Sequence, residues 1–451
     1  MKDTICAIST PPGIGGVALI RVSGPRSKEI VSKILEEPPK HKFEHGRFFH
    51  AFIKDHQKNE IIEEAIISYF KSPNSFTGED VVEISVHGGI YTPKLVLDLL
   101  IKNGARLAEP GEFTKRAFLN GKMDLIQVQA MIDLIKAKSE LQVKFAMSKL
   151  QGELSKKLKT VQNLIFDILR EVEARVEFEE DVPELDYVML KNNVEKILND
   201  LENFIIQGER NSLIFEGVQV AITGKPNVGK SSLFNSLLKM ERAIVTEIPG
   251  TTRDIIHEEF YLEGIPVRFY DTAGLRKTSE FVESIGIKRA EEIISNSHIK
   301  IFVLDASSPL TEEDFEAWQK LNGEVIVVLN KIDLGITADY MQLSGIEKFP
   351  LIRMSCITGE GLQELEDVIK STVKKFVLPG SEISLSQREL HILKDTYNEL
   401  REALDSINQK PLDIIAFHIQ NSARKLDEIF GIGDIPERVL NEIFRSFCIG
   451  K

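Results

Sequence analysis

The stretch GKPNVGKS, from Gly224 to Ser231, decides the fold of the middle of this chain. It fits the pattern G-x-x-x-x-G-K-[ST] of a phosphate-binding loop, which needs a strand before it and a helix after it. Both are expected, because apolar residues alternate over 218–222 and residues 232–238 are suited to a helix. The sequence therefore predicts a phosphate-binding loop in a doubly wound α/β domain.

Each residue type in this loop has a physical reason. Gly224 and Gly229 allow backbone bends that turn N–H groups towards phosphate oxygens, and the helix N-terminus adds its positive dipole end. Lys230 supplies a charge between the β- and γ-phosphates, and the Ser231 hydroxyl can ligate Mg²⁺. The nucleotide-binding residues predicted in this segment are Gly224, Asn227, Val228, Gly229, Lys230, Ser231 and Ser232.

Three later segments complete the series expected of a domain that binds GTP. DTAG begins at Asp271, whose carboxylate can hold the metal through water. NKID follows the apolar run 325–329, and Asp333 can accept both N–H groups on the edge of guanine, a pair that adenine lacks. SCI, which starts at Ser355, takes the place of the weak last motif, whose backbone would touch the guanine oxygen. The further predicted contacts are Thr246, Thr251, Thr252, Asp271, Thr272, Ala273, Gly274, Asn330, Lys331, Asp333, Ser355, Cys356 and Ile357.

Composition narrows the class of protein. The chain has 451 residues, of which 42% are hydrophobic and 28% charged, and a formal net charge of −13. These values fit roughly two to four globular domains and disfavour an overall basic nucleic-acid binder, so RNA contact would need a local basic patch or a partner. Cys6, Cys356 and Cys448 are far apart and give no disulfide or zinc spacing, so we expect a cytoplasmic protein. No run predicts a signal peptide or a membrane span.

The pattern changes along the chain predict a multidomain fold with α/β and all-α parts. The predicted segments are an N-terminal α+β domain over 1–118 with strands at 17–22, 66–70 and 81–86; a helical segment over 119–214 with one stripe from Leu150 to Val172; the nucleotide domain over 215–376; and a second helical segment over 377–451. We interpret the two helical segments as one domain interrupted by an inserted nucleotide domain, because insertions are tolerated where entry and exit lie close together. Two separate helical domains remain the alternative.

Outside the nucleotide motifs, four stretches carry a resemblance to a known family. They are TPPGIGGVALIRVSG from Thr10, NSFTGEDVVEISVHGG from Asn74, PGEFTKRAFLNGKMDL from Pro110, and the C-terminal FCIGK from Phe447. Together with the GTP motifs, they make nearly the whole chain resemble the tRNA-modifying GTPase family known as MnmE or TrmE. The first three look like that family's tetrahydrofolate-binding and dimerising domain, and FCIGK is the family's most distinctive tag.

The resemblance implies partners and a second site. It implies a homodimer and a flavin-containing tRNA-modifying partner protein (MnmG/GidA type). Together they would modify C5 of the wobble uridine of certain tRNAs with 5-formyltetrahydrofolate or a related tetrahydrofolate as one-carbon donor. By motif match, Arg21, Glu83, Lys122 and Lys451 would contact the folate, although each alone reads as a surface charge.

The tag admits three interpretations. The resemblance implies that Cys448 is a reactive-site cysteine delivered to the folate region. Its position also suits prenylation, but Gly450 is not aliphatic and Lys451 is an atypical last residue for that motif. From the residues alone, a frayed end without function would be favoured.

The hydrolytic machinery differs from that of many small GTPases. Leu275 follows DTAG where those proteins carry a glutamine that orients water. The resemblance supports Glu283 as the catalytic residue that replaces it, whereas the residues alone favour a solvated helix charge. Asn227, Thr246, Ile248 and Thr251 match the family's pattern of K⁺ ligands, which would act in place of an arginine finger, and Thr252 would be a Mg²⁺ ligand beside Ser231. Arg253 and Arg276 are rival charge stabilisers, and the alternative for each is a surface arginine.

Two functions therefore stand as hypotheses. The first is a potassium-activated GTP hydrolase whose cycle drives tRNA modification. The second is a ribosome-assembly or RNA-binding switch GTPase. The second would normally carry an added RNA-binding module and lack both the folate-like domain and FCIGK, so the sequence favours the first.

Overall fold

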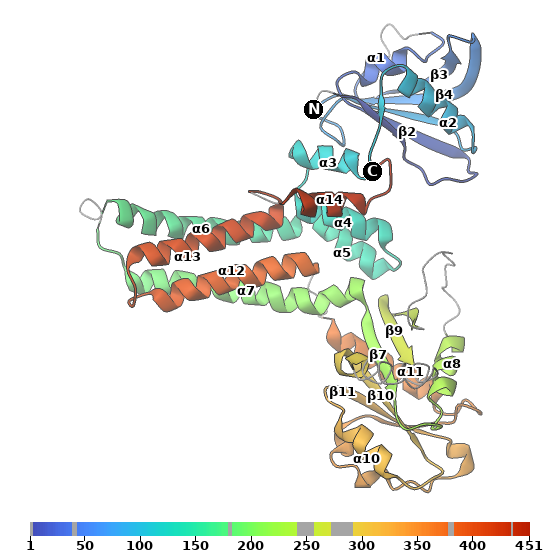
Figure 1. The fold of residues 1–451 in the computed structure, drawn as a ribbon, viewed down its shortest axis with the longest axis vertical. Helices are drawn as coiled ribbons and strands as arrows, with labels where there is room; N and C mark the ends of the chain where they lie inside the picture. The colour runs from blue at the N-terminus through green and yellow to red at the C-terminus, as the bar shows by residue number, and fades with distance from the viewer. Residues whose placement is uncertain are drawn as a thin grey trace, which may run out of the picture. The chain divides into compact units, whose positions relative to one another are not determined.

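The computed structural model describes most of the chain and separates into two compact units (Figure 1). The first unit comprises Met1–Ile135, Met147–Val194 and Asn398–Lys451, and the second comprises Lys136–Ala146 and Glu195–Tyr397. Two sheets and several long helices confirm the predicted fold class, a mixture of α/β and all-α parts. The described residues are 3–37, 43–178, 183–240, 257–271, 292–377, 383–433 and 436–451.

The first unit contains a sheet with the strand order β3-β4-β5-β2-β1-β6. Its neighbours are antiparallel except β1 and β6, which run parallel. Helices α1 (Ser27–Ser32) and α2 (Thr92–Lys102) pack on it and share its apolar core. The strands are β1 (Ile5–Ile8), β2 (Val17–Ser23), β3 (Phe48–Asp55), β4 (Glu60–Phe70), β5 (Val81–His87) and β6 (Arg106–Leu107).

Side chains along β2 and β5 alternate between the face of the sheet that the helices cover and the opposite face. Ile20 and Ile84 are fully buried in the core that α2 covers. Successive side chains of a strand point to opposite faces, so Arg21 and Glu83 lie on the face away from that core. The register pairs Arg21 directly with Glu83 across the two strands. Arg21 and Glu83, which are both predicted to contact the folate, are therefore direct neighbours across two adjacent strands.

The helices of the first unit bury the predicted apolar stripe. Helix α6 (Glu153–Glu177) packs along α13 (Leu412–Phe430), although the nucleotide segment separates them in sequence (Figure 1). The stripe was expected to start at Leu150, which is wrong, because Leu150 ends the preceding helix and Gly152 adopts φ +82° before α6 begins. The other helices here are α3 (Glu112–Leu119), α4 (Leu125–Lys136) and α14 (Glu437–Arg445), while α5 (Glu140–Leu150), α7 (Tyr187–Glu216) and α12 (Gln387–Ser406) run through both units.

The second unit contains a sheet with the strand order β12-β11-β10-β7-β9-β8. Its pairs are parallel except β8 with β9, and apolar cores lie on both faces, as a doubly wound sheet requires. The elements are β7 (Val218–Thr223), β8 (His257–Leu262), β9 (Ile265–Asp271), β10 (Ile299–Asp305), β11 (Glu324–Asn330), β12 (Leu351–Arg353), α8 (Lys230–Met240), α10 (Glu312–Gln319) and α11 (Leu362–Phe376).

The chain enters and leaves this sheet region at neighbouring points. The buried Asn211 amide near the end of α7 donates a hydrogen bond of 2.8 Å to the carbonyl oxygen of Ile383. A Cβ on Gly208 would lie 2.2 Å from a methyl carbon of Leu385, so the two segments are closely packed. This proximity is what an inserted domain needs, although the boundaries expected at 118, 214 and 376 stay predictions. No helix in the described part of the chain is long and apolar enough to cross a membrane.

Candidate functional site

The phosphate-binding loop lies between β7 and α8, as the motif predicts. Its two motif glycines are required by close approach. Gly224 adopts φ +141°, and a Cβ there would lie 2.3 Å from the carbonyl oxygen of Val303 on β10. Gly229 adopts φ +104°, and a Cβ there would lie 2.2 Å from Nδ2 of Asn330. Any side chain at either position would push the loop away from its neighbours.

The ammonium of Lys230 is buried against this loop. Its Nζ donates to the carbonyl oxygens of Gly224, at 2.8 Å, and of Lys225, at 2.6 Å. Lys230 is only 7% exposed, so its charge is little screened by water. The structure thus holds a cation where a phosphate group bound by the loop would need one.

The NKID segment joins the phosphate loop to the guanine side of the site. Asn330 Nδ2 donates to the carbonyl oxygen of Val228 at 2.8 Å, and its Oδ1 accepts the Cys356 N–H at 3.1 Å. Lys331, with φ +67°, donates to the carbonyl oxygen of Asn227 at 2.8 Å and to Asp305 Oδ2 at 2.6 Å. Three predicted motifs are therefore connected by direct hydrogen bonds.

The pKa values of Asp305 and Cys356 are shifted by the surroundings of these contacts. Burial raises the pKa of Asp305, but the hydrogen bonds from Lys331 and Ser307 outweigh it, so the pKa lies below its usual value. Burial raises the pKa of the Cys356 thiol to about 11, with Asp333 adding to the rise and Asn330 opposing it. Cys356 is therefore a neutral thiol at pH 7.

The carboxylate expected to bind guanine is accessible. Asp333 is exposed in the short 3-10 helix Ile332–Leu334 that follows β11. Ser355 is buried, and its Oγ accepts the Ile357 and Thr358 N–H groups at 3.2 Å each, which shapes the SCI loop. Ile357 is 84% exposed beside it. A planar base would therefore meet an exposed acceptor and an exposed apolar side chain.

Several predicted site residues fall outside the described part of the chain. Asp271 is the last residue of β9, and its backbone pairs in parallel register with Ile222 just before the phosphate loop. DTAG thus starts at the same sheet edge as the loop. The residues outside the described ranges are Thr246, Ile248, Thr251, Thr252, Thr272, Ala273, Gly274 and Glu283.

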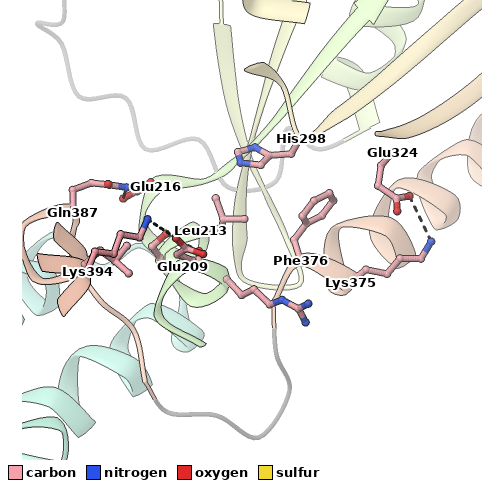
Figure 2. Close-up of a pocket in the computed structure, with 12 residues that line it drawn as sticks. Glu209, Leu213, Glu216, His298, Glu324, Lys375, Phe376, Gln387 and Lys394 are labelled. Carbon is pink, nitrogen blue, oxygen red and sulfur yellow. Dashed lines mark hydrogen bonds and ion pairs between the residues drawn. The ribbon is translucent and has the colours of Figure 1, made fainter. Parts of the chain in front are cut away.

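A cavity of about 550 Å³ in the second unit is lined by residues that belong to none of these motifs (Figure 2). His298, which precedes β10, and Glu324, which begins β11, stand at the N-terminal ends of their strands, whereas the phosphate loop follows the C-terminal end of β7. Because these strands are parallel, the cavity is at the opposite edge of the sheet. Burial lowers the pKa of His298, with Lys300 adding to the fall and Glu216 opposing it. This cavity is not the nucleotide site.

A second cluster forms in the first unit where the C-terminal tag meets the N-terminal sheet. Arg21 Nη2 and Nε both donate to Glu83 Oε1, at 2.7 and 2.9 Å. The carbonyl oxygen of Gly450 accepts the Ser9 hydroxyl at 3.0 Å and a longer contact of 3.5 Å from Arg21 Nη1. Phe447 is buried with Phe444, which anchors the tag.

The predicted folate contacts stay predictions, but the structure places several of them near one another. It brings Arg21, Glu83 and the tag together, and Cys448 is exposed there. The Lys122 ammonium donates to the Pro73 carbonyl oxygen at 3.1 Å, on the loop that also carries Phe76. Three further participants were not predicted: Ser9, and the Phe76 and Phe113 rings that lie 5.2 and 5.7 Å from the Arg21 guanidinium. Phe76 and Phe113 stand inside the quoted stretches, which was the available signal.

Comparisons with known proteins cover the whole chain. The family model "GTP-binding protein TrmE N-terminus" matches residues 4–122, and the model "MnmE helical domain" matches residues 125–448. The chain is similar to the "tRNA modification GTPase MnmE" of Thermoanaerobacter pseudethanolicus, with 42% identity over 100% of this chain and 99% of that one. It is also similar to the protein of the same name from Aquifex aeolicus, with 40% identity over 100% of both chains.

Among solved structures, one match is Era from Aquifex aeolicus, bound to GDP and AlF4−. It has 22% identity over 51% of this chain and 99% of that chain, with a TM-score of 0.28.

Proposed function

The chain belongs to the tRNA modification GTPase MnmE family, and we propose that it is a potassium-activated member that uses a tetrahydrofolate at its C-terminal tag. Its GTP hydrolase activity and its role in tRNA modification follow from that membership. The proposal adds the cation, the one-carbon donor and the partner. The donor would be 5-formyltetrahydrofolate or a related compound, and a flavin-containing protein would complete the modification of C5 of the wobble uridine in the cytoplasm.

For GTP itself, the chain's own residues have distinct roles. Lys230 would leave the loop carbonyls of Gly224 and Lys225 for the β- and γ-phosphates, an exchange of neutral acceptors for charged ones. Ser231, exposed at the start of α8, fits a Mg²⁺ ligand, since a hydroxyl oxygen is a suitable donor for that ion. Asp333 would select guanine through its two N–H groups.

The potassium part of the proposal rests on Asn227 and Leu275. Leucine at 275 cannot orient water, so the charge that develops on the γ-phosphate needs another stabiliser. The backbone carbonyl oxygen of Asn227 accepts a hydrogen bond from Lys331, so the exposed side-chain amide is the part of Asn227 that can offer an oxygen ligand to the cation. Carbonyls from Thr246, Ile248 and Thr251 would complete the cage, and Glu283 would orient the attacking water.

The cation is tested by exchanging salts. We expect hydrolysis by the full chain, saturated with GTP, to be much faster in potassium than in sodium at equal ionic strength, because a carbonyl cage sized for one ion binds the other poorly. Asn227→Ala should lose this difference and retain GTP binding through Lys230 and Asp333. Equal rates of the unaltered chain in both salts would contradict potassium activation and favour an arginine, such as Arg253 or Arg276.

The folate part of the proposal is carried by one observation, the contact between the tag and the Arg21–Glu83 pair. Residues 441 positions apart, Ser9 and Gly450, share a hydrogen bond there. A guanidinium and a carboxylate side by side can bind a ligand that has both a polar pterin and a carboxylate tail. Cys448, exposed in the same tag, would be the reactive group.

Deletion of the tag tests whether wobble-uridine modification can be lost while GTP hydrolysis is kept. We expect deletion of Cys448–Lys451 to abolish wobble-uridine modification in cells, measured by mass analysis of tRNA, and to leave GTP hydrolysis largely intact. Cys448→Ser in the full-length chain isolates the thiol from the backbone contacts of the tag. Full modification by the deletion variant, with its helicity unchanged, would remove the tag from the proposal.

Folate binding has a direct test that does not depend on tRNA. The full chain should retain 5-formyltetrahydrofolate in equilibrium dialysis, and Arg21→Met should lose it because the guanidinium is the main cation at the site. Lys28→Met, which removes a cation from elsewhere in the same domain, is the matched control. Equal retention by all three proteins would contradict the assignment of Arg21.

A homodimer through the N-terminal domain is supported by exposed apolar side chains. Ile14, Tyr91 and Ile90 are 87%, 77% and 55% exposed, and the Gly15 N–H donates to the Gly88 carbonyl oxygen at 2.7 Å, which joins their two loops. Apolar groups gathered on a surface are typical of an interface. We expect Tyr91→Asp to lower the mass measured by light scattering, whereas Phe417→Asp, at another exposed ring, should not. An unchanged mass for Tyr91→Asp would contradict this interface.

A further inference from the structure

The second residue of the phosphate-binding loop makes a contact that none of the nucleotide motifs requires. Lys225 Nζ lies 2.7 Å from Asp314 Oδ2 and 3.3 Å from the hydroxyl of Thr311. The Lys225 side chain is 15% exposed and that of Asp314 is 1% exposed. A lysine from the loop after β7 is therefore tied to the first turn of α10, 89 residues further along the chain.

The local fold alone does not explain the pairing. Asp314 Oδ2 already accepts the Thr311 N–H at 2.8 Å and the Thr311 hydroxyl at 3.0 Å, as expected of an acidic residue near a helix start. Its other oxygen, Oδ1, is buried and makes no hydrogen bond within the described residues. A carboxylate so placed carries a desolvation cost that its helix partners do not fully offset. Lys225 supplies the compensating cation.

The backbone of the same residue holds the nucleotide-binding lysine. The carbonyl oxygen of Lys225 accepts the Lys230 ammonium at 2.6 Å, the shorter of that group's two loop contacts. The Asp314 contact thus fixes the side chain of Lys225, and the Lys225 carbonyl holds the Lys230 ammonium at the loop until a phosphate group takes its place. Asp314, Lys225 and Lys230 form a continuous chain of polar contacts from α10 to the ammonium that meets the phosphates.

We propose that Lys225 is a positioning residue whose ion pair with Asp314 holds the phosphate-binding loop in its nucleotide-binding shape. Ordering the loop in advance lowers the entropic cost of binding. The β-phosphate is common to GTP and GDP, so the benefit applies to both nucleotides equally. It acts on binding and not on the hydrolytic step, and therefore affects KM and not kcat.

The first test compares three substitutions. Lys225→Met and Asp314→Asn should each weaken GTP and GDP binding by the same factor, about tenfold for a lost charged contact of this kind, with kcat nearly unchanged. Lys225→Arg should restore most of the affinity because it keeps the cation. Lys375→Met removes a lysine from an ion pair at the opposite edge of the sheet and is the matched control. Nucleotide affinities come from direct titration and KM and kcat from steady-state hydrolysis.

The second test separates positioning from stability. Lys225→Met leaves Asp314 buried without its cation, so it lowers Tm. Adding Asp314→Leu removes the buried charge, and the double variant should recover Tm while nucleotide affinity stays about tenfold weaker. If affinity recovers together with Tm, the pair is structural only and the proposal fails. If Lys225→Met weakens binding but Asp314→Asn does not, Lys225 contacts phosphate directly and the proposal is again wrong. A fall in kcat at unchanged KM would also overturn it.

Discussion

Gly450→Ala should release the C-terminal tag from the N-terminal sheet. Gly450 adopts φ +94°, and an added Cβ would lie 2.6 Å from the carbonyl oxygen of Ile8 and 2.8 Å from the Cα of Ser9. Both neighbours are backbone atoms of a strand and its end, so neither can move aside as a flexible side chain would. The tag must shift, and the hydrogen bond from Ser9 to the Gly450 carbonyl is lost with it.

The size of the effect can be worked from a matched position. Gly433 adopts φ +91°, and no described atom lies within 4 Å of its ideal Cβ. Alanine at either position carries the same cost of a left-handed backbone, about 1–2 kcal/mol. Only Gly450→Ala also loses the Ser9 bond and the Arg21 contact, together about 2 kcal/mol. The docked fraction of the tag should therefore fall roughly 30-fold in the Gly450 variant and stay nearly unchanged in the Gly433 variant.

Hydrogen exchange of the amides at 447–451 measures this difference. We expect faster exchange in Gly450→Ala and little change there in Gly433→Ala, with both proteins equally folded by circular dichroism. Loss of wobble-uridine modification should accompany the faster exchange. Equal exchange at 447–451 in the two variants would refute the reasoning, because it would mean that the contact with Ile8 and Ser9 does not hold the tag.

Three further predictions concern other parts of the molecule. Asp333→Asn should weaken GTP binding and favour a xanthine nucleotide, because the amide replaces one acceptor with a donor; an unchanged GTP affinity in direct titration would remove Asp333 from the base site. Gly229→Ala should lower nucleotide affinity at least tenfold, since its Cβ would meet Asn330 Nδ2 at 2.2 Å, and binding equal to the unaltered chain would show that the loop relaxes freely. Iodoacetamide at pH 8 should label exposed Cys448 first, because burial raises the pKa of Cys6 to about 12 and that of Cys356 to about 11; peptide mass mapping would contradict this if Cys6 reacted in the folded protein.

Strands and loops whose residue types depend on near neighbours in the sequence could be predicted from the local pattern. The alternation over 17–22 and 81–86 gave strands, because one face of each is buried against α2 and the other is not. The phosphate loop was predictable for the same reason, since its glycines, lysine and serine act within a few residues of one another. The break between α5 and α6 was missed because the apolar spacing continues through Gly152, and only the backbone turn there ends the helix.

Long-range contacts could not be predicted from such patterns. The strand expected at 66–70 is the end of β4, whose first residues, Glu60 to Glu64, pair with β3 and carry too many carboxylates to read as a strand. The meeting of Ser9 with Gly450 depends on how two ends of the chain fold together, which no local spacing encodes. Lys225 was overlooked because a lysine at that position looks like a solvated charge until α10 places Asp314 beside it.

The hydrogen bond between Asn211 and Ile383 also bears on how this chain tolerates changes in length. For the entropy of the chain, residues 212–382 can be treated as one closed loop between α7 and α12, because the Asn211–Ile383 hydrogen bond already holds its two ends together. The entropic cost of closing a loop grows only with the logarithm of its length, by about 0.6 kcal/mol for each doubling. By this term alone, insertions or deletions in the intervening segment cost the helices little. Exchange of the whole segment must also preserve its contacts with the start of α5, where the Ser139 hydroxyl donates to the Gly264 carbonyl oxygen at 2.6 Å and Leu141 packs against the core of the segment.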